Sequence, residues 1–124
     1  MSWKFSNDKP IFQQLIDRIT TDIISGKYKP GDKLEPVREL AVTAGVNPNT
    51  MQRALAIVEE IGLIYTKRGD GRYVSEDSQN AAAAKDAAIN KNVNELIQSL
   101  KNLGLDNDSI VARVQAALSD KQGG

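Results

Sequence analysis

The residues best suited to chemistry are hydrogen-bonding side chains at the start of one predicted helix, residues 47–61. They are Asn47, Asn49, Thr50, Gln52 and Arg53. Amide and guanidinium groups match the donors and acceptors on DNA base edges, and the free backbone amides of a first helical turn attract phosphate. The pattern therefore predicts a helix that reads nucleic acid.

Both ends of this helix are marked in the sequence. Asn47 is a typical N-cap, Pro48 suits the first helical position, and Gly62 favours a left-handed ending. Apolar residues recur at helical spacing on a different face; they are Met51, Leu55, Val58 and Ile61. We expect that face to be buried, which leaves the polar first turns free to contact a ligand.

Composition argues against catalysis. The 124 residues include no Cys and no His, which removes thiol nucleophiles, imidazole bases and the usual ligands of zinc. Glu59 and Glu60 are neighbours on a helix and point about 100° apart, so they are a poor catalytic pair. We therefore predict a protein that is not an enzyme and that binds no metal and no cofactor.

Hydropathy gives no sign of a membrane protein. No apolar run approaches the roughly 20 residues that a membrane-spanning helix needs, and the first residues, MSWKF, do not form an export signal. We expect a cytoplasmic protein without a membrane partner.

The charges are balanced overall but unevenly placed. Sixteen basic and sixteen acidic residues give a net charge of zero, which usually disfavours nucleic acid as a partner. Residues 1–75, however, hold eleven Lys and Arg against nine Asp and Glu, and residues 76–124 hold five against seven. Lys67, Arg68 and Arg72 gather around two glycines, and such local clustering favours phosphate contact.

Two shorter helices are predicted upstream of residue 47. The first covers residues 10–25, with Pro10 in its first turn and Asn7 or Asp8 as its cap; its apolar stripe consists of Phe12, Leu15, Ile16, Ile19 and Ile23. A Pro-Gly turn then leads into residues 32–34, which can add one edge strand.

The second upstream helix begins at Pro36 and runs to Ala44, with Arg38 outward. Gly45 then turns the chain into the helix capped by Asn47. Two short helices joined by a glycine-containing turn, with the second presented outward, form a helix-turn-helix.

A predicted β-hairpin follows this motif. Residues 63–66 and 72–74 are rich in strand formers and flank a Gly-Asp-Gly centre that suits a tight turn. Behind a helix-turn-helix the hairpin is expected to be a wing that contacts the DNA backbone or minor groove through Lys67, Arg68 and Arg72, with Gly71 allowing close approach. In isolation the same charges would only keep the hairpin soluble.

The C-terminal part predicts a polar hinge at residues 75–80 and then two amphipathic helices, separated at Gly104. Their apolar residues, expected to contact a second copy, are Ile89, Val93, Leu96, Leu100, Leu103, Ile110, Val114 and Leu118. Helices this short are marginal alone and too small to enclose a ligand domain. We predict that they dimerise; the alternative is that they fold back onto their own winged domain.

The expected architecture is therefore mainly α with a small β-hairpin. A winged helix-turn-helix domain occupies residues 1–75, and a two-helix dimerisation segment occupies residues 76–124.

Several spaced motifs together resemble the N-terminal domain of GntR family transcription regulators. The motifs are Gly26–Gly31 (GKYKPG), Asp32–Leu34 (DKL), Val37–Ala41 (VRELA), Gly45–Thr50 (GVNPNT), Gly62–Ile64 (GLI) and Gly69–Val74 (GDGRYV). The NPNTMQRA form of the helix and the short tail are similar to the YtrA-like subfamily in particular. The resemblance implies a dimeric bacterial repressor of the kind that often controls transporter genes.

The resemblance also implies which residues touch DNA. The arginine of the family's second helix falls on Arg38, and its wing glycine falls on Gly71. The recognition-helix contacts fall on Asn47, Pro48, Asn49, Thr50, Gln52 and Arg53. Many family members have Arg where this chain has Pro48 and Gln52, so its base preference is expected to move away from guanine.

One position departs from the family pattern. The capping Ser before the second helix is absent, and we expect Glu35 to accept hydrogen bonds from the first amides of that helix instead. An alternative role for the predicted contact arginines is ordinary surface pairing. Arg38 would then pair with Glu35 or Glu39; Arg53 would pair with Asp22 or Glu59.

The leading interpretation is a homodimer that binds double-stranded DNA at a palindromic operator and represses transcription. The operator, the regulated genes and any small-molecule effector stay open. A second interpretation, favoured by the zero net charge, is a winged-helix module that binds a partner protein and no DNA.

Overall fold

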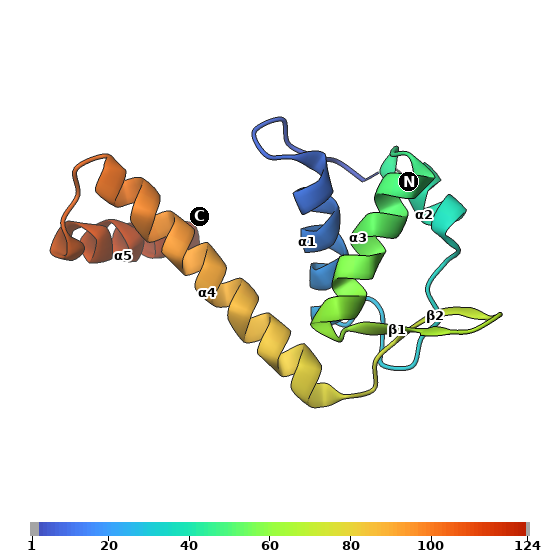
Figure 1. Cartoon of the computed structure of the whole chain (residues 1–124). Coiled ribbons are helices and arrows are strands. Elements are labelled where there is room, and N and C mark those ends of the chain that lie inside the picture. The colour runs from blue at the N-terminus through green and yellow to red at the C-terminus, as the bar shows by residue number, and fades with distance from the viewer. Residues whose placement is uncertain (1–2, 124) are drawn as a thin grey trace. The chain divides into compact units, whose positions relative to one another are not determined.

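The computed structural model describes residues 3–123, with side chains described up to residue 120. Figure 1 shows the order of the elements along the chain. They are α1 (Ile11–Ile24), α2 (Val37–Ala44), α3 (Pro48–Ile61), β1 (Ile64–Lys67), β2 (Gly71–Val74), α4 (Ser78–Asn102) and α5 (Asn107–Gly123). The predicted fold class, mainly helical with one small hairpin, is confirmed.

The chain divides into two compact units, and the division falls after Asp86, inside α4. We call residues 3–86 the winged unit and residues 87–123 the tail unit. No helix in the described range is both long and apolar enough to span a bilayer.

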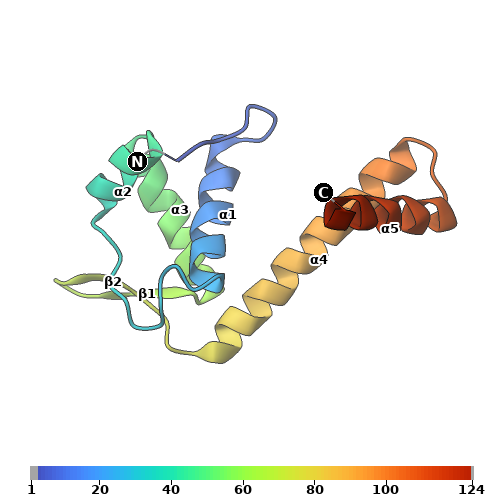
Figure 2. The ribbon, with the colours of Figure 1, turned by 180° about the vertical axis from the view of Figure 1, so that it is seen from behind.

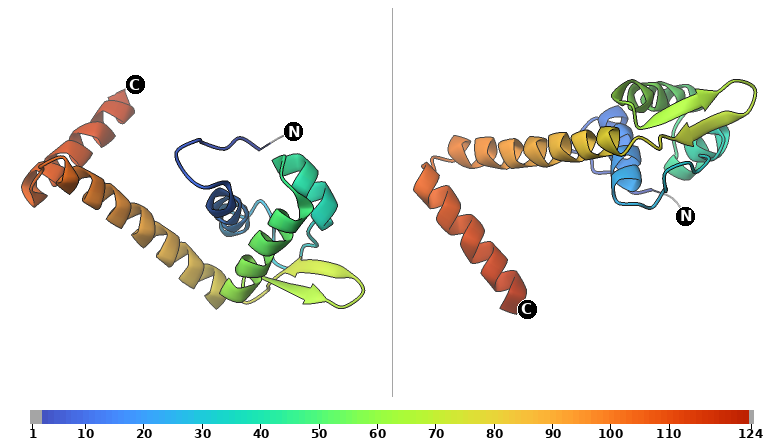
Figure 3. Two further views of the ribbon diagram at one scale, coloured as in Figure 1. Left: turned by 45° about the horizontal axis from the view of Figure 1, so that its top comes forward. Right: turned by 90° about the horizontal axis from the view of Figure 1, so that it is seen from below.

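The core of the winged unit lies between its three helices and the hairpin. Figures 2 and 3 show α1 beside α3, with the hairpin at the C-terminal end of α3; α2 also packs against α3. The most deeply buried large side chains are Leu15, Ile19, Met51, Leu55, Val58, Leu63 and Val74. These are the apolar stripes of α1 and α3 together with both sides of the hairpin base, so burial follows the helical periodicity of the sequence.

The N-terminal cap of helix α1 differs from the predicted one. Pro10 occupies the N-cap position, and no side chain caps the helix, so the predicted cap by Asn7 or Asp8 is wrong. The Gln14 side chain organises this turn instead: its Nε2 donates to the carbonyls of Ser6 and Lys9 at 2.8 Å each, and its Oε1 accepts from the Ser6 amide. A side chain inside the first helical turn thus fixes the preceding loop, although it accepts no hydrogen bond from the helix amides.

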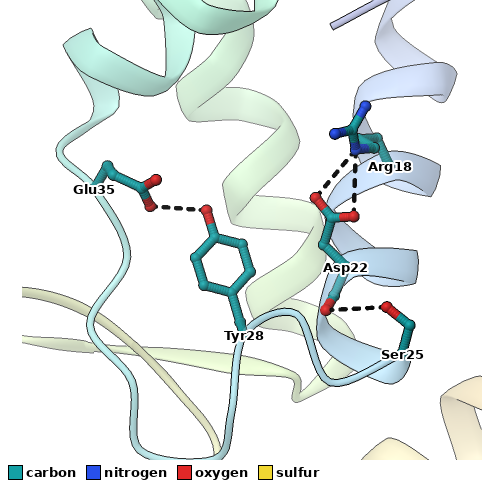
Figure 4. Close-up of polar contacts among 5 residues, drawn as sticks. All are labelled: Arg18, Asp22, Ser25, Tyr28 and Glu35. Carbon is teal, nitrogen blue, oxygen red and sulfur yellow. Dashed lines mark hydrogen bonds and ion pairs between the residues drawn. The ribbon is translucent and has the colours of Figure 1, made fainter. Parts of the chain in front are cut away.

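A polar cluster at the C-terminal end of α1 ties the following loop to the helix (Figure 4). Asp22 is only 7% exposed, and the Arg18 guanidinium pairs with it at 3.1 Å. The Tyr28 amide donates to the Asp22 carbonyl, and the Tyr28 hydroxyl donates to Glu35 at 2.7 Å. Burial of the ring, together with the bond to Glu35, raises the pKa of Tyr28.

This cluster corrects the predicted role of Glu35. Helix α2 starts at Val37, with Pro36 in the N-cap position and no side-chain cap. The Glu35 carboxylate is engaged by Tyr28 seven residues earlier, so it stabilises the loop and does not cap the helix.

The hairpin strands are antiparallel, and each sits close to its predicted position. The register pairs Ile64 with Val74, Tyr65 with Tyr73, Thr66 with Arg72, and Lys67 with Gly71. The predicted edge strand is present as a single bridge between Lys33 and Tyr73, supported by the Leu34 amide donating to the Arg72 carbonyl at 2.9 Å.

The start of α4 is anchored to the winged unit. The helix begins at Ser78, so the non-helical linker is shorter than the predicted hinge of residues 75–80. The Asn80 side chain donates to the Gly62 carbonyl at 3.0 Å, and the Ser75 amide donates to Leu63. Gly62 itself has φ 93°, the predicted left-handed ending of α3.

In the tail unit the chain reverses at Gly104, whose φ is 96°. Asp106 then accepts the Ser109 amide at 2.9 Å at the start of α5; this bond lowers the pKa of Asp106. The apolar residues predicted for dimerisation are mostly uncovered: Ile89, Val93, Leu96, Leu103 and Leu118 are between 46% and 77% exposed. Leu100 and Val114 are half-buried, whereas Ile110 is 7% exposed and therefore already covered by its own chain.

Candidate nucleic-acid interface

Helix α3 presents its polar first turns to solvent. The Asn47 side chain caps it by accepting the Asn49 amide at 2.7 Å, and Pro48 is the first helical residue, as the sequence predicts. Asn49, Gln52 and Arg53 are exposed, and together with Ala56 they line a shallow surface hollow; Thr50 is half-buried. The opposite face, including Met51 at 0% exposure, is locked in the core, so this helix is held in a fixed orientation.

The side chain of Arg53 lies over an aromatic ring of α1. Its guanidinium carbon is 4.8 Å from the centre of the Phe12 ring, a cation–π distance. The carboxylates considered as alternative partners are engaged elsewhere: Asp22 by Arg18, and Glu59 by Thr66 and Arg72. One side of the Arg53 guanidinium therefore packs on the Phe12 ring, while Arg53 as a whole stays exposed on the surface of α3.

Arg38 lies in the first turn of α2 and is exposed. It borders a second shallow hollow with Glu39, Val42 and Thr43. Val42 is 80% exposed, so this hollow is open to solvent. The arginine predicted to contact phosphate is therefore accessible, as such a contact requires.

The wing has two different faces because side chains alternate along its strands. Tyr65, Lys67 and Tyr73 share the outer face: the two tyrosine rings stack with centres 5.9 Å apart, and the Lys67 ammonium lies 4.4 Å from the centre of the Tyr73 ring. Arg68 is exposed in the turn. Lys67 and Arg68 are thus positioned on the outer side and tip of the wing.

Arg72 lies on the inner face of the wing. Its side chain is 22% exposed, its Nε is 4.0 Å from a Glu59 oxygen, and that Nε has no hydrogen-bond partner among the described atoms. Thr66, its cross-strand neighbour, donates to the same carboxylate at 2.9 Å. The structure therefore separates Arg72 from the two other wing cations, and its predicted DNA contact stays a prediction.

The tip of the wing carries a polar cluster that sequence patterns did not indicate. Asp70 accepts the Lys33 ammonium at 2.9 Å and the Tyr73 hydroxyl at 2.7 Å. These bonds lower the pKa of Asp70 and raise the pKa values of Lys33 and Tyr73. Lys33 and Asp70 are 37 positions apart, so no local motif could have paired them; the only sequence signal was the predicted edge strand.

A contact within the chain explains why position 71 is a glycine. Its φ is 149°, and a Cβ at this position would lie 3.1 Å from the Lys33 Cε. The glycine therefore accommodates the Lys33 side chain as well as the wing turn. Among the described residues, no group of acidic side chains is arranged to hold a metal ion.

Comparison with known proteins now identifies this arrangement. Residues 11–74, which span α1 through the wing, match the family model of bacterial regulatory proteins of the gntR family. The chain belongs to the gntR family. The predicted family resemblance is confirmed, and the chain is a transcription regulator of the winged helix-turn-helix type.

Similarity to individual GntR-family proteins extends beyond the winged unit. The HTH-type transcriptional repressor YtrA of Bacillus subtilis (strain 168) is 34% identical over 116 residues, covering 93% of this chain and 89% of YtrA. A GntR family transcriptional regulator from Listeria monocytogenes has 39% identity and a TM-score of 0.80, covering 90% of this chain and 98% of that one.

A DNA complex is also among the similar structures. The DNA-binding domain of AraR in complex with operator ORE1 has 28% identity and a TM-score of 0.53, covering 60% of this chain and 93% of that one. The part of the fold that this chain shares with AraR is therefore the part present in the complex of AraR with its operator.

Proposed function

We propose that this regulator is a homodimeric, sequence-specific repressor that binds a palindromic DNA operator in the cytoplasm. The observation that carries the proposal is the exposed polar start of α3, where Asn49, Gln52 and Arg53 face solvent while the opposite face is buried. The major groove of B-DNA is about 12 Å wide and admits an α-helix, so such side chains reach base edges.

The neighbouring cations suit contacts to the DNA backbone. Arg38 at the start of α2 and Lys67 and Arg68 on the wing are exposed and lie in elements that flank α3 in a helix-turn-helix docking. Lys67 and Arg68 would meet phosphate or the minor groove beside the base pairs read by α3. Asn47 and Pro48 would bring the helix N-terminus, with its partial positive charge, close to phosphate.

The tail supports the homodimer. Ile89, Val93 and Leu96 are spaced by four and three residues along α4, and each is nearly half exposed. Covering such a stripe with the same stripe of a second copy produces two-fold symmetry, which a palindromic operator requires. The relative YtrA is named a repressor, and we extend this mode of action to the present chain; the family resemblance favours a transporter operon as its target.

The direct test is a fluorescence anisotropy titration of the full chain with duplexes from the region upstream of its own gene, at several salt concentrations. We expect sequence-dependent binding whose affinity falls steeply with salt. Arg38→Ala should weaken binding to every duplex about tenfold, and Gln52→Ala should relax the preference at one base pair per half-site. Absence of any sequence-dependent, salt-sensitive binding would refute the proposal.

A matched control separates interface effects from net charge. Arg113→Ala removes the same charge from an exposed position on α5, and we expect operator affinity to stay within about twofold of the parent. An equal loss from Arg113→Ala and Arg38→Ala would mean that only overall charge matters and that α2 has no specific contact.

A second candidate function is a winged-helix module that binds a partner protein without DNA. Its supporting observation is the exposed apolar surface of the tail, including Leu103 at 77% and Leu118 at 59% exposure, in a chain of zero net charge. Analytical ultracentrifugation distinguishes the two: a stable dimer that binds duplex DNA supports the repressor, and a monomer that binds no duplex supports the module.

A further inference from the structure

Lys33 lies outside the three segments in which contacts to DNA were predicted, yet the fold brings it to the wing. It precedes α2 by four residues and pairs with Tyr73 of β2 through the edge bridge. Its ammonium is 2.9 Å from Asp70 in the wing turn and 5.9 Å from the centre of the Tyr73 ring. Lys33 therefore lies beside the wing, on the segment that leads along the chain into α2 and Arg38.

The backbone around Lys33 is held firmly, whereas its side chain is not enclosed. The Val74 amide donates to the Asp32 carbonyl at 2.8 Å, and the Leu34 amide donates to Arg72, so hydrogen bonds fix the residues on both sides of Lys33. The Lys33 side chain remains 50% exposed, and that of Asp70 remains 46% exposed. A fixed backbone with an accessible ammonium is the arrangement that a backbone-phosphate contact needs.

The partner of this ammonium is exchangeable. An exposed ion pair gains little net free energy in water, so replacing the carboxylate with another oxyanion has a small cost. Phosphate offers a lysine the same kind of charged oxygen acceptor, and DNA supplies phosphates at high local density. Asp70, also bound by the Tyr73 hydroxyl, stays in the wing turn when the ammonium leaves.

We propose that Lys33 is a further contact to the DNA backbone, and that Asp70 holds its ammonium at the wing in the free protein and releases it to a phosphate in the complex. The proposal rests on the proposed function, since it requires that the wing approaches DNA. It extends the interface from the hairpin to the edge strand beside it. Asp70 thus acts as a positioning residue and as an internal competitor of phosphate.

The test uses the full chain and an operator duplex selected by the parent protein from a pool of random duplexes. Affinity is measured by anisotropy across a series of salt concentrations. We expect Lys33→Met to weaken binding about fivefold and to reduce the slope of log affinity against log salt by about 0.9, the value for one lost phosphate contact. Lys33→Arg should keep the slope of the parent, because it retains the charge at this position.

Lys27→Met is the matched control. It removes one charge from an exposed lysine in the loop after α1, outside the cluster, and we expect the slope to be unchanged. Far-UV circular dichroism of each variant establishes that the fold is retained. If Lys33→Met leaves the salt slope unchanged, or if Lys27→Met lowers it equally, the proposal is overturned.

The role of Asp70 is tested by a double-mutant cycle. Asp70→Asn should strengthen binding several-fold, and the gain should shrink on the Lys33→Met background because there is no ammonium left to release. Equal gains on both backgrounds, or weaker binding by Asp70→Asn, would overturn the competitor role. Failure of the parent protein to select any duplex refutes the proposed function and this inference together, whereas normal selection with an unaffected Lys33→Met variant refutes this inference alone.

Discussion

Large apolar residues are mostly buried in the winged unit and mostly exposed in the tail unit. In the winged unit Leu15 and Leu55 are at most 1% exposed, whereas in the tail Leu96 is 46% and Leu103 is 77% exposed. Burying a leucine fully contributes about 1.5–3 kcal/mol, and the tail residues gain only part of this in a single chain. The winged unit therefore buries its own large apolar residues, whereas the tail leaves several of its own exposed.

The difference follows from the number of elements in each unit. Three helices and a hairpin can surround a common core, with α3 contacted by α1, α2 and β1. In the tail, by contrast, the two helices contact each other too little to form a shared core: Ile110 near the start of α5 is buried, whereas the stripe of α4 stays open. We infer that binding is the task of the first unit and that association is the task of the second.

The largest effect is expected from truncating the core of the winged unit. Leu15→Ala should lower the free energy of unfolding by about 2–5 kcal/mol, because it leaves a cavity among buried neighbours. Urea titration followed by fluorescence of Trp3, the only tryptophan, measures the effect in the winged unit. Leu103→Ala is the control; at concentrations where the chain is monomeric it should change the same transition by less than about 0.5 kcal/mol. A comparable loss from both variants would show that the tail belongs to the core of the monomer.

The next test addresses association. Leu96→Asp should raise the dimer dissociation constant about 100-fold or more, since each copy loses an apolar contact and places a charge in the interface. Sedimentation equilibrium measures the constant. Asn94→Asp, which adds the same charge at another exposed position of α4, should leave the dimer largely intact. If the Leu96→Asp chain has the same mass in solution as the parent, the stripe on α4 is not the dimer interface.

A smaller effect is expected at the cap of α3. Asn47→Ala should lower the unfolding free energy of the winged unit by about 1 kcal/mol, because the Asn49 amide loses its acceptor. Asn49→Ala makes the same chemical change at a position without a capping side chain, and it should have little effect or raise stability slightly. Both values come from urea titration of the winged unit. Equal destabilisation by the two variants would contradict the assignment of Asn47 as the cap.

The smallest expected effect concerns alkaline pH. The pKa of Tyr28 is raised, so in the unfolded chain the phenol ionises near its ordinary value of about 10 while the folded chain keeps it protonated. Stability is therefore complete below about pH 10 and falls as pH rises further. We expect this group to account for about 1 kcal/mol or less by about pH 11.

Tyr28→Phe tests this dependence. The variant should lose stability less steeply than the parent between about pH 10 and pH 11, in urea titrations at a series of pH values. The tail contains no tyrosine, so its association serves as an internal reference. A parallel pH dependence of parent and variant would show that the environment of Tyr28 does not contribute.

Much of the binding surface was predictable because its signals are local. Asn47, Pro48 and Gly62 mark the ends of α3 within one helix length, and the structure has them in the predicted roles. The starts of α1 and α2 were predicted less well. Prolines occupy both N-cap positions, and the stabilising bonds come from Gln14 and Tyr28, whose side chains act across a turn or loop that no capping rule describes.

The sequence predicted that the wing carries basic residues, but it did not predict which face of the hairpin each of them occupies. Lys67 and Arg72 read alike as basic residues near a glycine turn, yet strand alternation puts Lys67 beside Tyr73 and Arg72 beside Glu59. The assignment depends on the strand register, and a shift by one residue would exchange the two faces. The register therefore decides which cation is available at the outer face.

The amino-acid sequence by itself determined the helices, the turn between α2 and α3, the hairpin and the family, because caps, periodicity and turn residues act over a few neighbouring positions. Only the tertiary structure decided which charges meet. Lys33 reaches Asp70, and Arg18 reaches the Trp3 ring, because folding brings these residues together. Ion pairs and ring contacts act through space over a few ångströms irrespective of distance along the chain.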